Sequence, residues 1–374
     1  MKRALEISKQ RDLLKQEINV LIENTLPARI LQTAGSLIQR LTRRPNLPPW
    51  YINTILLGII AIFPQFLAAL ILWDSNQIIG NELLWSITTE AMVLVIPAVY
   101  LLLKYILTII HDHIVNDIEE NDNLIKLQEF LLELRKLPRS MTVVLLVSII
   151  WSSVVLPLLS TVFSINLGVF LAVVVGNIAL GLILFFMSWY MQFPSQFQNY
   201  QYKLYKLDPA KSEVISHISN LLTVPFFAGA IFQATLILVL SFFKDQFKVR
   251  TVTDIPWLLI TFVFFPLFVV WLPLIVHFIN SQIAINKIIN TAKWHVLAEI
   301  QHEIDQQYTT PKLQLTQNIE TINKLMDLYE RLYNTYNSKL AATRILSFLN
   351  QLILPLIASL ISNYKDIINL FSQP

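Results

Sequence analysis

One acidic residue, Glu90, lies deep inside an apolar stretch of the sequence, in the run Ser86-Ile-Thr-Thr-Glu90. A carboxyl group at that depth in a membrane is costly unless it is paired, hydrated or protonated, so it marks a candidate functional site. We expect Glu90 to line a polar cavity on the path of an ion or a proton. The alternative is a structural acid that is neutral, or hydrogen-bonded to Thr88, Thr89 or a neighbouring helix.

A second set of polar residues recurs on one side of the apolar segment Ile345–Ser362 near the end of the chain. These residues are Ser347, Gln351, Ser359 and Asn363. Three interpretations stay open for this polar stripe. It could join helices of one subunit by hydrogen bonds, form the wet wall of a pore made by several copies, or mark a helix that lies in the membrane interface.

Histidines and carboxylates also cluster, but their spacing does not suit a metal site or a catalytic pair. The two clusters are His111, Asp112, His113 and Asp117, and His295, His302 and Glu303. Residues two apart on a helix point in divergent directions, and the second cluster lacks a standard ligand spacing. The chain has no cysteine, no Gly-rich phosphate loop, no nucleophile elbow and no HExxH motif. We therefore expect neither an enzyme nor a bound metal or cofactor; an intramembrane enzyme would need two polar groups, such as Glu90 and His277, to converge.

The composition is that of a protein built mainly to sit in lipid. Of its 374 residues, 55% are hydrophobic and only 14% are charged, whereas about a quarter are charged in a typical soluble domain. The mean hydropathy is +0.56. A formal net charge of +3 is too small to suggest a nucleic-acid partner.

Six apolar runs are each long enough to cross the membrane as a helix, which needs about twenty residues. They are Tyr51–Trp73, Leu83–Ile110, Met141–Phe163, Leu167–Met191, Leu222–Phe243 and Pro256–Ile279. Ile345–Ser362 is a candidate seventh span or a membrane-surface helix. No strand pattern is present. The sequence therefore predicts an all-α, polytopic integral membrane protein with six or seven transmembrane helices.

Lysine and arginine residues indicate which side of the membrane each connection faces. They are frequent in the N-terminal region and in the second and fourth connections, and absent from the first and third. Lys244, Lys248 and Arg250 in the fifth connection run against the rule. The balance predicts a cytoplasmic N-terminus in a plasma or inner membrane. The C-terminus would be outside if Ile345–Ser362 spans and inside if it lies on the surface.

The regions outside the spans are predicted to form a cytoplasmic helical bundle. Residues 1–50 read as two amphipathic helices, and residues 51–280 hold six spans with helical cytoplasmic connections at 112–138 and 192–220. Residues 281–344 extend the sixth span and then form a helix with a heptad seam, and residues 345–374 are the apolar C-terminal segment. The seam comprises Leu315, Ile319, Ile322, Met326, Tyr329, Tyr333, Tyr336 and Leu340.

Four arginines flank the apolar side of the second amphipathic helix, Ala28 to Arg44. They are Arg29, Arg40, Arg43 and Arg44. An arginine-bearing amphipathic helix just before a span often lies on an anionic membrane surface, so these residues could bind anionic lipid. Packing of this helix against other cytoplasmic helices is the equal alternative.

Small residues follow a four-residue spacing at Gly168, Ala172 and Gly176 in the fourth apolar run, with Asn177 beside them. Such spacing lets another helix approach closely, and an amide can add an interhelical hydrogen bond. We expect this face to pack against a neighbouring helix.

Long cytoplasmic helices, short outer loops and a striped last segment favour a homo-oligomeric ion-channel-like transport protein in the bilayer. This layout is similar to that of the insect gustatory and odorant receptor channels, which have a cytoplasmic N-terminus, helices extended into the cytoplasm and a last pore helix. The Tyr-plus-Gln-Phe motif of that family's last helix is absent from Ile345–Ser362, and no family membership is inferred from a shared layout. The alternative function is a non-transporting membrane scaffold or signalling protein that acts through its cytoplasmic bundle.

Overall fold

The computed structural model describes residues 2–42, 50–71, 93–135, 142, 146, 149–150, 167–224, 265–309 and 315–334. Almost all of these residues are helical, and the only strand-like pairing among them is a single bridge between Ile118 and Tyr202. The predicted all-α fold class is confirmed. Three described helices are long and apolar enough to cross a membrane, namely Val95–Asp117, Val174–Phe197 and Leu272–Gln307. The chain is therefore a helical membrane protein.

The chain divides into two compact units. Unit 1 comprises Met1–Asn116 and Glu120–Gln192, and unit 2 comprises Asp117–Glu119 and Phe193–Pro374. The helices of the first polypeptide half are α1 (Lys2–Asn24), α2 (Leu26–Thr42), α3 (Trp50–Ile71), α5 (Val95–Ile109), the π-helix η1 (Ile110–Ile114), α6 (Val115–Asp117), α7 (Asn121–Leu132), the 3-10 turn η2 (Glu133–Arg135) and α9 (Leu167–Tyr190).

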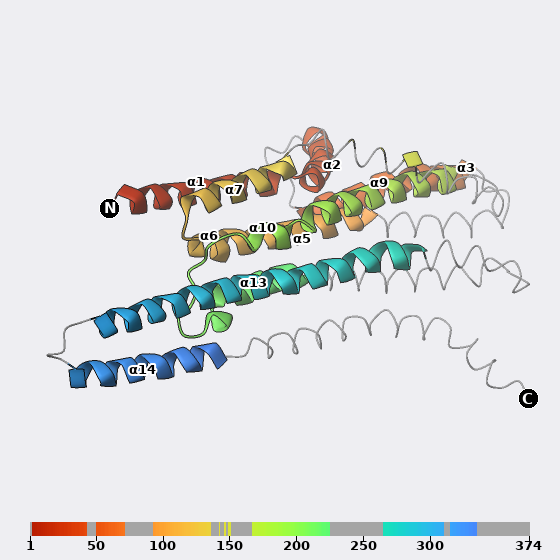
Figure 1. The fold of residues 1–374 in the computed structure, drawn as a ribbon. Helices are drawn as coiled ribbons and strands as arrows, with labels where there is room; N and C mark the ends of the chain where they lie inside the picture. The colour runs from red at the N-terminus through yellow and green to blue at the C-terminus, as the bar shows by residue number, and fades with distance from the viewer. Residues whose placement is uncertain are drawn as a thin grey trace, which may run out of the picture. The chain divides into compact units, whose positions relative to one another are not determined.

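In unit 1 the N-terminal helix α1 lies along α7 (Figure 1). Leu14, Ile18 and Leu21 recur at three- and four-residue steps on α1 and are all buried, which is the pattern of a helix with one packed face. A polar network then fixes the register of the pair. Gln10 donates to Gln128 across 2.8 Å, and Gln128 donates in turn to the carboxylate of Glu17 across 2.7 Å.

The second core of unit 1 joins α2 to the apolar helices α3, α5 and α9. Leu26 and Leu31 of α2 are buried with Ile96 of α5 and Leu182 of α9, and Leu57 of α3 packs against them. The apolar face of α2 is thus covered by protein. One alternative predicted for this helix is packing against other cytoplasmic helices, but the structure covers this face with the apolar helices α3, α5 and α9.

The second apolar run continues past its span but does not form one straight extension through residue 132. The helix ends at Asp117, and α7 begins at Asn121. The break arises because backbone groups of Asp117 and Glu119 pair with another segment: Lys203 N donates to Asp117 O across 2.8 Å and Glu119 N to Gln201 O across 3.0 Å. On α7, Ile125 is 38% exposed, so it lies off the packed face that buries Leu124 and Leu127.

Unit 2 is built on one long helix, α13 (Phe265–Thr309), with α14 (Leu315–Asn334) running back beside it (Figure 1). The short helix α10 (Phe193–Phe197), the 3-10 turn η3 (Pro209–Lys211) and a helical stretch at 213–224 complete its described part. At 45 residues, α13 is about 68 Å long, roughly twice what the hydrocarbon core requires. It includes the extension predicted for the sixth span.

Candidate functional site

The helix pair α13–α14 is held by an apolar interface that runs along both helices. Its buried residues are Leu297, Ile300 and Ile304 of α13 and Ile322 and Leu332 of α14, with Leu325, Leu328 and Tyr329 partly buried against them. The two helices run antiparallel, so Tyr333 lies beside Lys293.

The predicted heptad seam is divided by this packing. Ile322 is buried against α13, whereas Ile319, Met326 and Tyr333 are 49%, 54% and 55% exposed. These three residues are seven apart, so they form one line along α14; we call them the exposed α14 stripe. Tyr336 and Leu340 lie outside the described residues. The apolar arc of α14 is therefore wider than α13 alone covers.

An aromatic cluster closes the end of the pair where α14 ends. The Tyr333 ring stacks with Tyr329 at a centroid distance of 6.3 Å and meets Trp294 edge-on at 6.3 Å. Lys293 Nζ donates to the Tyr333 carbonyl across 2.8 Å and lies 5.9 Å from the Tyr333 ring centroid. Trp294 is 57% exposed, so this cluster presents an indole face outside the packed pair.

A loop of unit 2, residues 198–212, packs against the same part of α13. Lys206 pairs with Glu299 at 3.3 Å, and Lys287 donates to Asn199 across 3.5 Å. Tyr202 donates to the Phe197 carbonyl across 3.1 Å. Burial raises the pKa of the Tyr200 and Tyr202 hydroxyls. Both phenols therefore stay protonated at physiological pH and act as packed, structural side chains.

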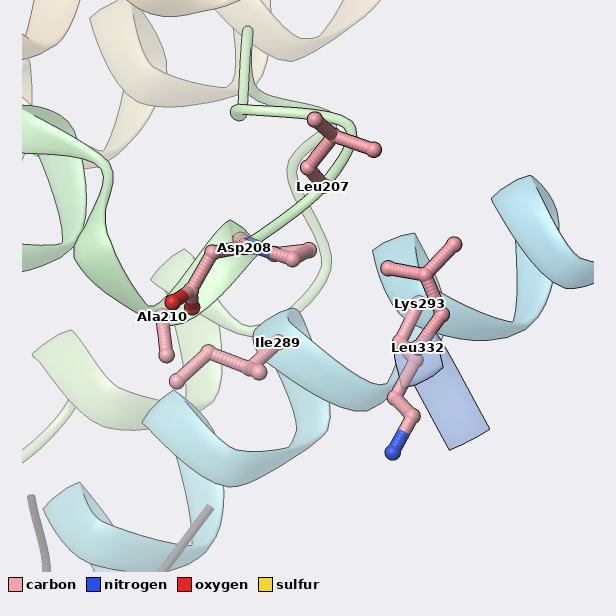
Figure 2. A pocket seen from close by; sticks show the side chains of 7 residues that line it. Leu207, Asp208, Ala210, Ile289, Lys293 and Leu332 are labelled. Carbon is pink, nitrogen blue, oxygen red and sulfur yellow. The ribbon is translucent and has the colours of Figure 1, made fainter. Parts of the chain in front are cut away.

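A small cavity separates this loop from the helix pair (Figure 2). Its lining residues are Leu207, Asp208, Pro209, Ala210, Ile289, Lys293 and Leu332. The volume of about 10 Å³ holds one water at most. Asp208 pairs with Lys211 at 2.8 Å. Figure 2 shows that the Lys293 amino group points away from the Asp208 carboxylate. The cavity is a packing defect between the loop and the helix pair, and it is too small to bind a substrate.

A buried histidine lies on the part of α13 inside a candidate span. His277 and Ser281 are each 1% exposed, and Ser281 Oγ donates to the His277 carbonyl across 2.7 Å. The helical stretch 213–224 contributes the Leu222 backbone beside the His277 ring. Glu90, the residue that would have to converge with His277 in an enzyme, lies outside the described residues.

At the other end of the chain, α2 and α3 approach each other closely in unit 1. A Cβ built on Gly35 would lie 2.4 Å from Asn53 Oδ1, and Asn53 is only 3% exposed. The missing side chain of Gly35 therefore leaves room for the Asn53 amide; we call this contact the notch at Gly35. Sequence reasoning missed this contact, and its only signal was a glycine within an otherwise regular amphipathic helix.

The structure describes only part of the predicted small-residue face on α9. Gly168, Ala172, Gly176 and Asn177 all lie within this helix, and Gly176 is half-buried. Ala179, Leu182 and Phe186 continue along α9 as buried residues. The predicted packing of Gly168, Ala172 and Gly176 against a neighbouring helix stays a prediction.

Several predicted site residues lie outside the described residues. They are Glu90, Ser347, Gln351, Ser359, Asn363, Arg43 and Arg44. In the described part of the chain, no three His, Asp or Glu side chains come together as a metal site. His111 Nδ1 lies 2.5 Å from Asp112 Oδ1 on the solvent side of η1, a pairing of neighbours in the sequence.

No protein-family model, no curated protein and no solved structure matches this chain. Its function is therefore inferred from its own geometry. Two features stand out among the described residues: the antiparallel pair α13–α14, and the contact of α2 with the start of α3.

Proposed function

We propose that this chain is a subunit of a homo-oligomeric, ion-channel-like membrane transport protein. It would have six or seven spans, a cytoplasmic N-terminus and a cytoplasmic bundle that includes α13 and α14. The observation that carries this proposal is the antiparallel return of α14 along α13. Because of that return, the chain comes back toward the membrane just before its last apolar segment.

Distances along α13 support this proposal. If the sixth span ends at Ile279, as the sequence predicts, about 30 residues of α13 project beyond it over roughly 45 Å. The contact between Lys293 and Tyr333 then brings the end of α14 to about 21 Å from Ile279, at 1.5 Å per helical residue. Twelve steps from Tyr333 to Ile345 cover about 18 Å as a helix and about 40 Å as an extended chain. Ile345 therefore has the reach to enter the bilayer without the whole connection being helical.

A last span that entered there would carry the polar stripe Ser347, Gln351, Ser359 and Asn363 through the membrane. In a ring of copies this stripe would face the axis and form the wet wall of a pore, with Glu90 as a second polar group on the path. A carrier that binds substrate at broken helices is less well supported, because only 7 glycines occur in the whole chain.

Cysteine scanning tests the proposal directly, because the chain has no native cysteine. We expect purified protein in planar bilayers to conduct ions. A cationic thiol reagent should change the conductance of Ser347→Cys, Gln351→Cys and Ser359→Cys proteins. Ile353→Cys, on the opposite side of a helix from the stripe, is the matched control and should leave the conductance unchanged.

Absence of conductance in any lipid and ion tested, with no stripe-specific modification, would overturn the channel proposal. The second candidate, a membrane scaffold or signalling protein, would then gain weight. It is favoured by one specific observation, the exposed α14 stripe with Trp294 beside it, since exposed apolar residues on an extramembrane helix suit a protein partner.

A further inference from the structure

The two faces of α2 differ sharply in chemistry. Ala28, Leu31, Ala34 and Gly35 on one side are buried. Arg29 and Arg40 are eleven residues apart, which is about three helical turns, so they share the opposite side. Arg40 and Thr33 on that side are exposed and Arg29 is half-buried. We call Arg29, Thr33 and Arg40 the outer face of α2.

The contact between Gly35 and Asn53 fixes the level of this outer face relative to the start of α3. Asn53 comes three residues after Trp50, the first residue of α3, which is about 5 Å along the helix axis. Trp50 and Tyr51 are 38% and 53% exposed and their rings meet edge-on at 6.0 Å. Exposed aromatic residues at the end of an apolar helix lie at the headgroup level of a bilayer. The middle of α2 lies at the same level.

Charge on this helix is of one sign. The sequence of α2, LPARILQTAGSLIQRLT, contains two arginines and no acidic residue. Arg29 Nη2 donates to Asn24 Oδ1 across 3.2 Å, which orients its guanidinium group. Guanidinium groups bind phosphate through paired hydrogen bonds, and anionic lipids attract basic residues that lie near their surface. The nearest acidic residue in sequence, Glu23, belongs to α1.

We propose that the outer face of α2, together with Trp50 and Tyr51, is a binding site for the headgroups of anionic phospholipids. The arginines bind the phosphates, and the two aromatic rings occupy the boundary between headgroup and acyl chain. The apolar face of α2 remains packed against α3 and α5, so α2 holds a lipid-binding face at a fixed position on the protein. This site does not depend on whether the protein conducts ions.

Thermal unfolding of the full-length protein in detergent micelles measures this binding, since a ligand that binds the folded state raises Tm. Titration with phosphatidylglycerol should raise the Tm of the wild type, and titration with phosphatidylcholine should not. In R29Q/R40Q the apparent affinity for phosphatidylglycerol should fall about thirtyfold, which follows from roughly 1 kcal/mol for each basic residue near an anionic surface. R40Q alone keeps the bond between Arg29 and Asn24 and should lose about fivefold.

The matched control is K9Q/K126Q, which removes the same charge from exposed positions on α1 and α7 and should keep wild-type affinity. Inorganic phosphate at equal concentration should not raise the Tm. Wild-type affinity in both R40Q and R29Q/R40Q, or an equal loss in K9Q/K126Q, would overturn the proposal. An equal rise in Tm with inorganic phosphate would also overturn it, because the site would then bind a free anion.

Discussion

The notch at Gly35, where α2 approaches α3, gives a test at the scale of one residue. An added methyl group at Gly35 would lie 2.4 Å from Asn53 Oδ1 and 2.8 Å from its Cγ. Alanine is favoured over glycine in a helix by up to about 1 kcal/mol, but overpacking a buried contact costs about 1–3 kcal/mol. Because Asn53 is almost fully buried, we expect the cost of overpacking to exceed the gain in helix propensity.

Gly35→Ala should therefore lower the Tm of the purified protein, and Asn53→Ala in the same chain should restore most of the loss by removing the obstructing amide. Thr33→Ala, on the exposed side of α2, is the control and should change the free energy of unfolding by less than about 0.5 kcal/mol. An unchanged or higher Tm for Gly35→Ala would show that α2 and α3 separate easily at this point.

Single residues also show how far the site could be predicted. The basic side of α2 was evident from the spacing of its arginines, because a helical period of 3.6 places Arg29 and Arg40 together. The Gly35–Asn53 contact was not, because it depends on which part of α3 crosses α2. A sequence period shows which residues share a face and does not show which partner that face meets.

At the scale of elements, the pair α13–α14 gives the clearest separation of packed and exposed positions. Leu332 is 4% exposed in the interface, whereas Met326 on the exposed α14 stripe is 54% exposed. Truncation of a buried leucine costs about 2–5 kcal/mol through lost burial and the cavity left behind. Truncation of an exposed side chain is usually nearly neutral.

We therefore expect Leu332→Ala to increase hydrogen exchange along α14 by at least tenfold and to make it sensitive to protease. Met326→Ala should match the wild type in both measurements. Equal effects of the two substitutions would contradict the described interface, and a large effect of Met326→Ala alone would show that the exposed α14 stripe is covered in the assembled protein.

The same helices show why periodicity gave only part of their arrangement. The heptad spacing correctly indicated a helix that packs lengthwise, but it could not divide the apolar arc between α13 and the exposed α14 stripe. Likewise, the helical connection predicted at 112–138 did not show the break at Ile118. That break depends on backbone hydrogen bonds to residues 201–203, more than eighty residues away in the sequence.

For the whole molecule, composition and hydropathy were sufficient for the fold class. With 55% hydrophobic residues and 14% charged, a chain satisfies its backbone hydrogen bonds in lipid most simply as helices. Three such helices are long and apolar enough to cross a membrane among the described residues. Composition does not fix the number of spans. That number decides the topology, since one additional span moves the C-terminus to the other side of the membrane.

The number of spans is also what the channel proposal depends on most. With a cytoplasmic N-terminus and seven spans, an odd number, the two termini must lie on opposite sides of the membrane. Single cysteines in this cysteine-free chain report the side through a membrane-impermeant maleimide. In intact cells we expect Ser75→Cys in the first connection and Ser372→Cys to react, and Ser8→Cys on α1 to react only after permeabilisation.

Ser75→Cys serves as the control for orientation, because it follows the first apolar run and its connection contains no lysine or arginine. If it reacts in intact cells and Ser372→Cys does not, the chain has six spans and Ile345–Ser362 stays on the cytoplasmic side. The polar stripe would then have no path through the bilayer, and α14 with its exposed stripe would favour the scaffold function. Reaction of Ser8→Cys in intact cells would reverse the proposed orientation, since an N-terminal region rich in lysine and arginine would then lie outside.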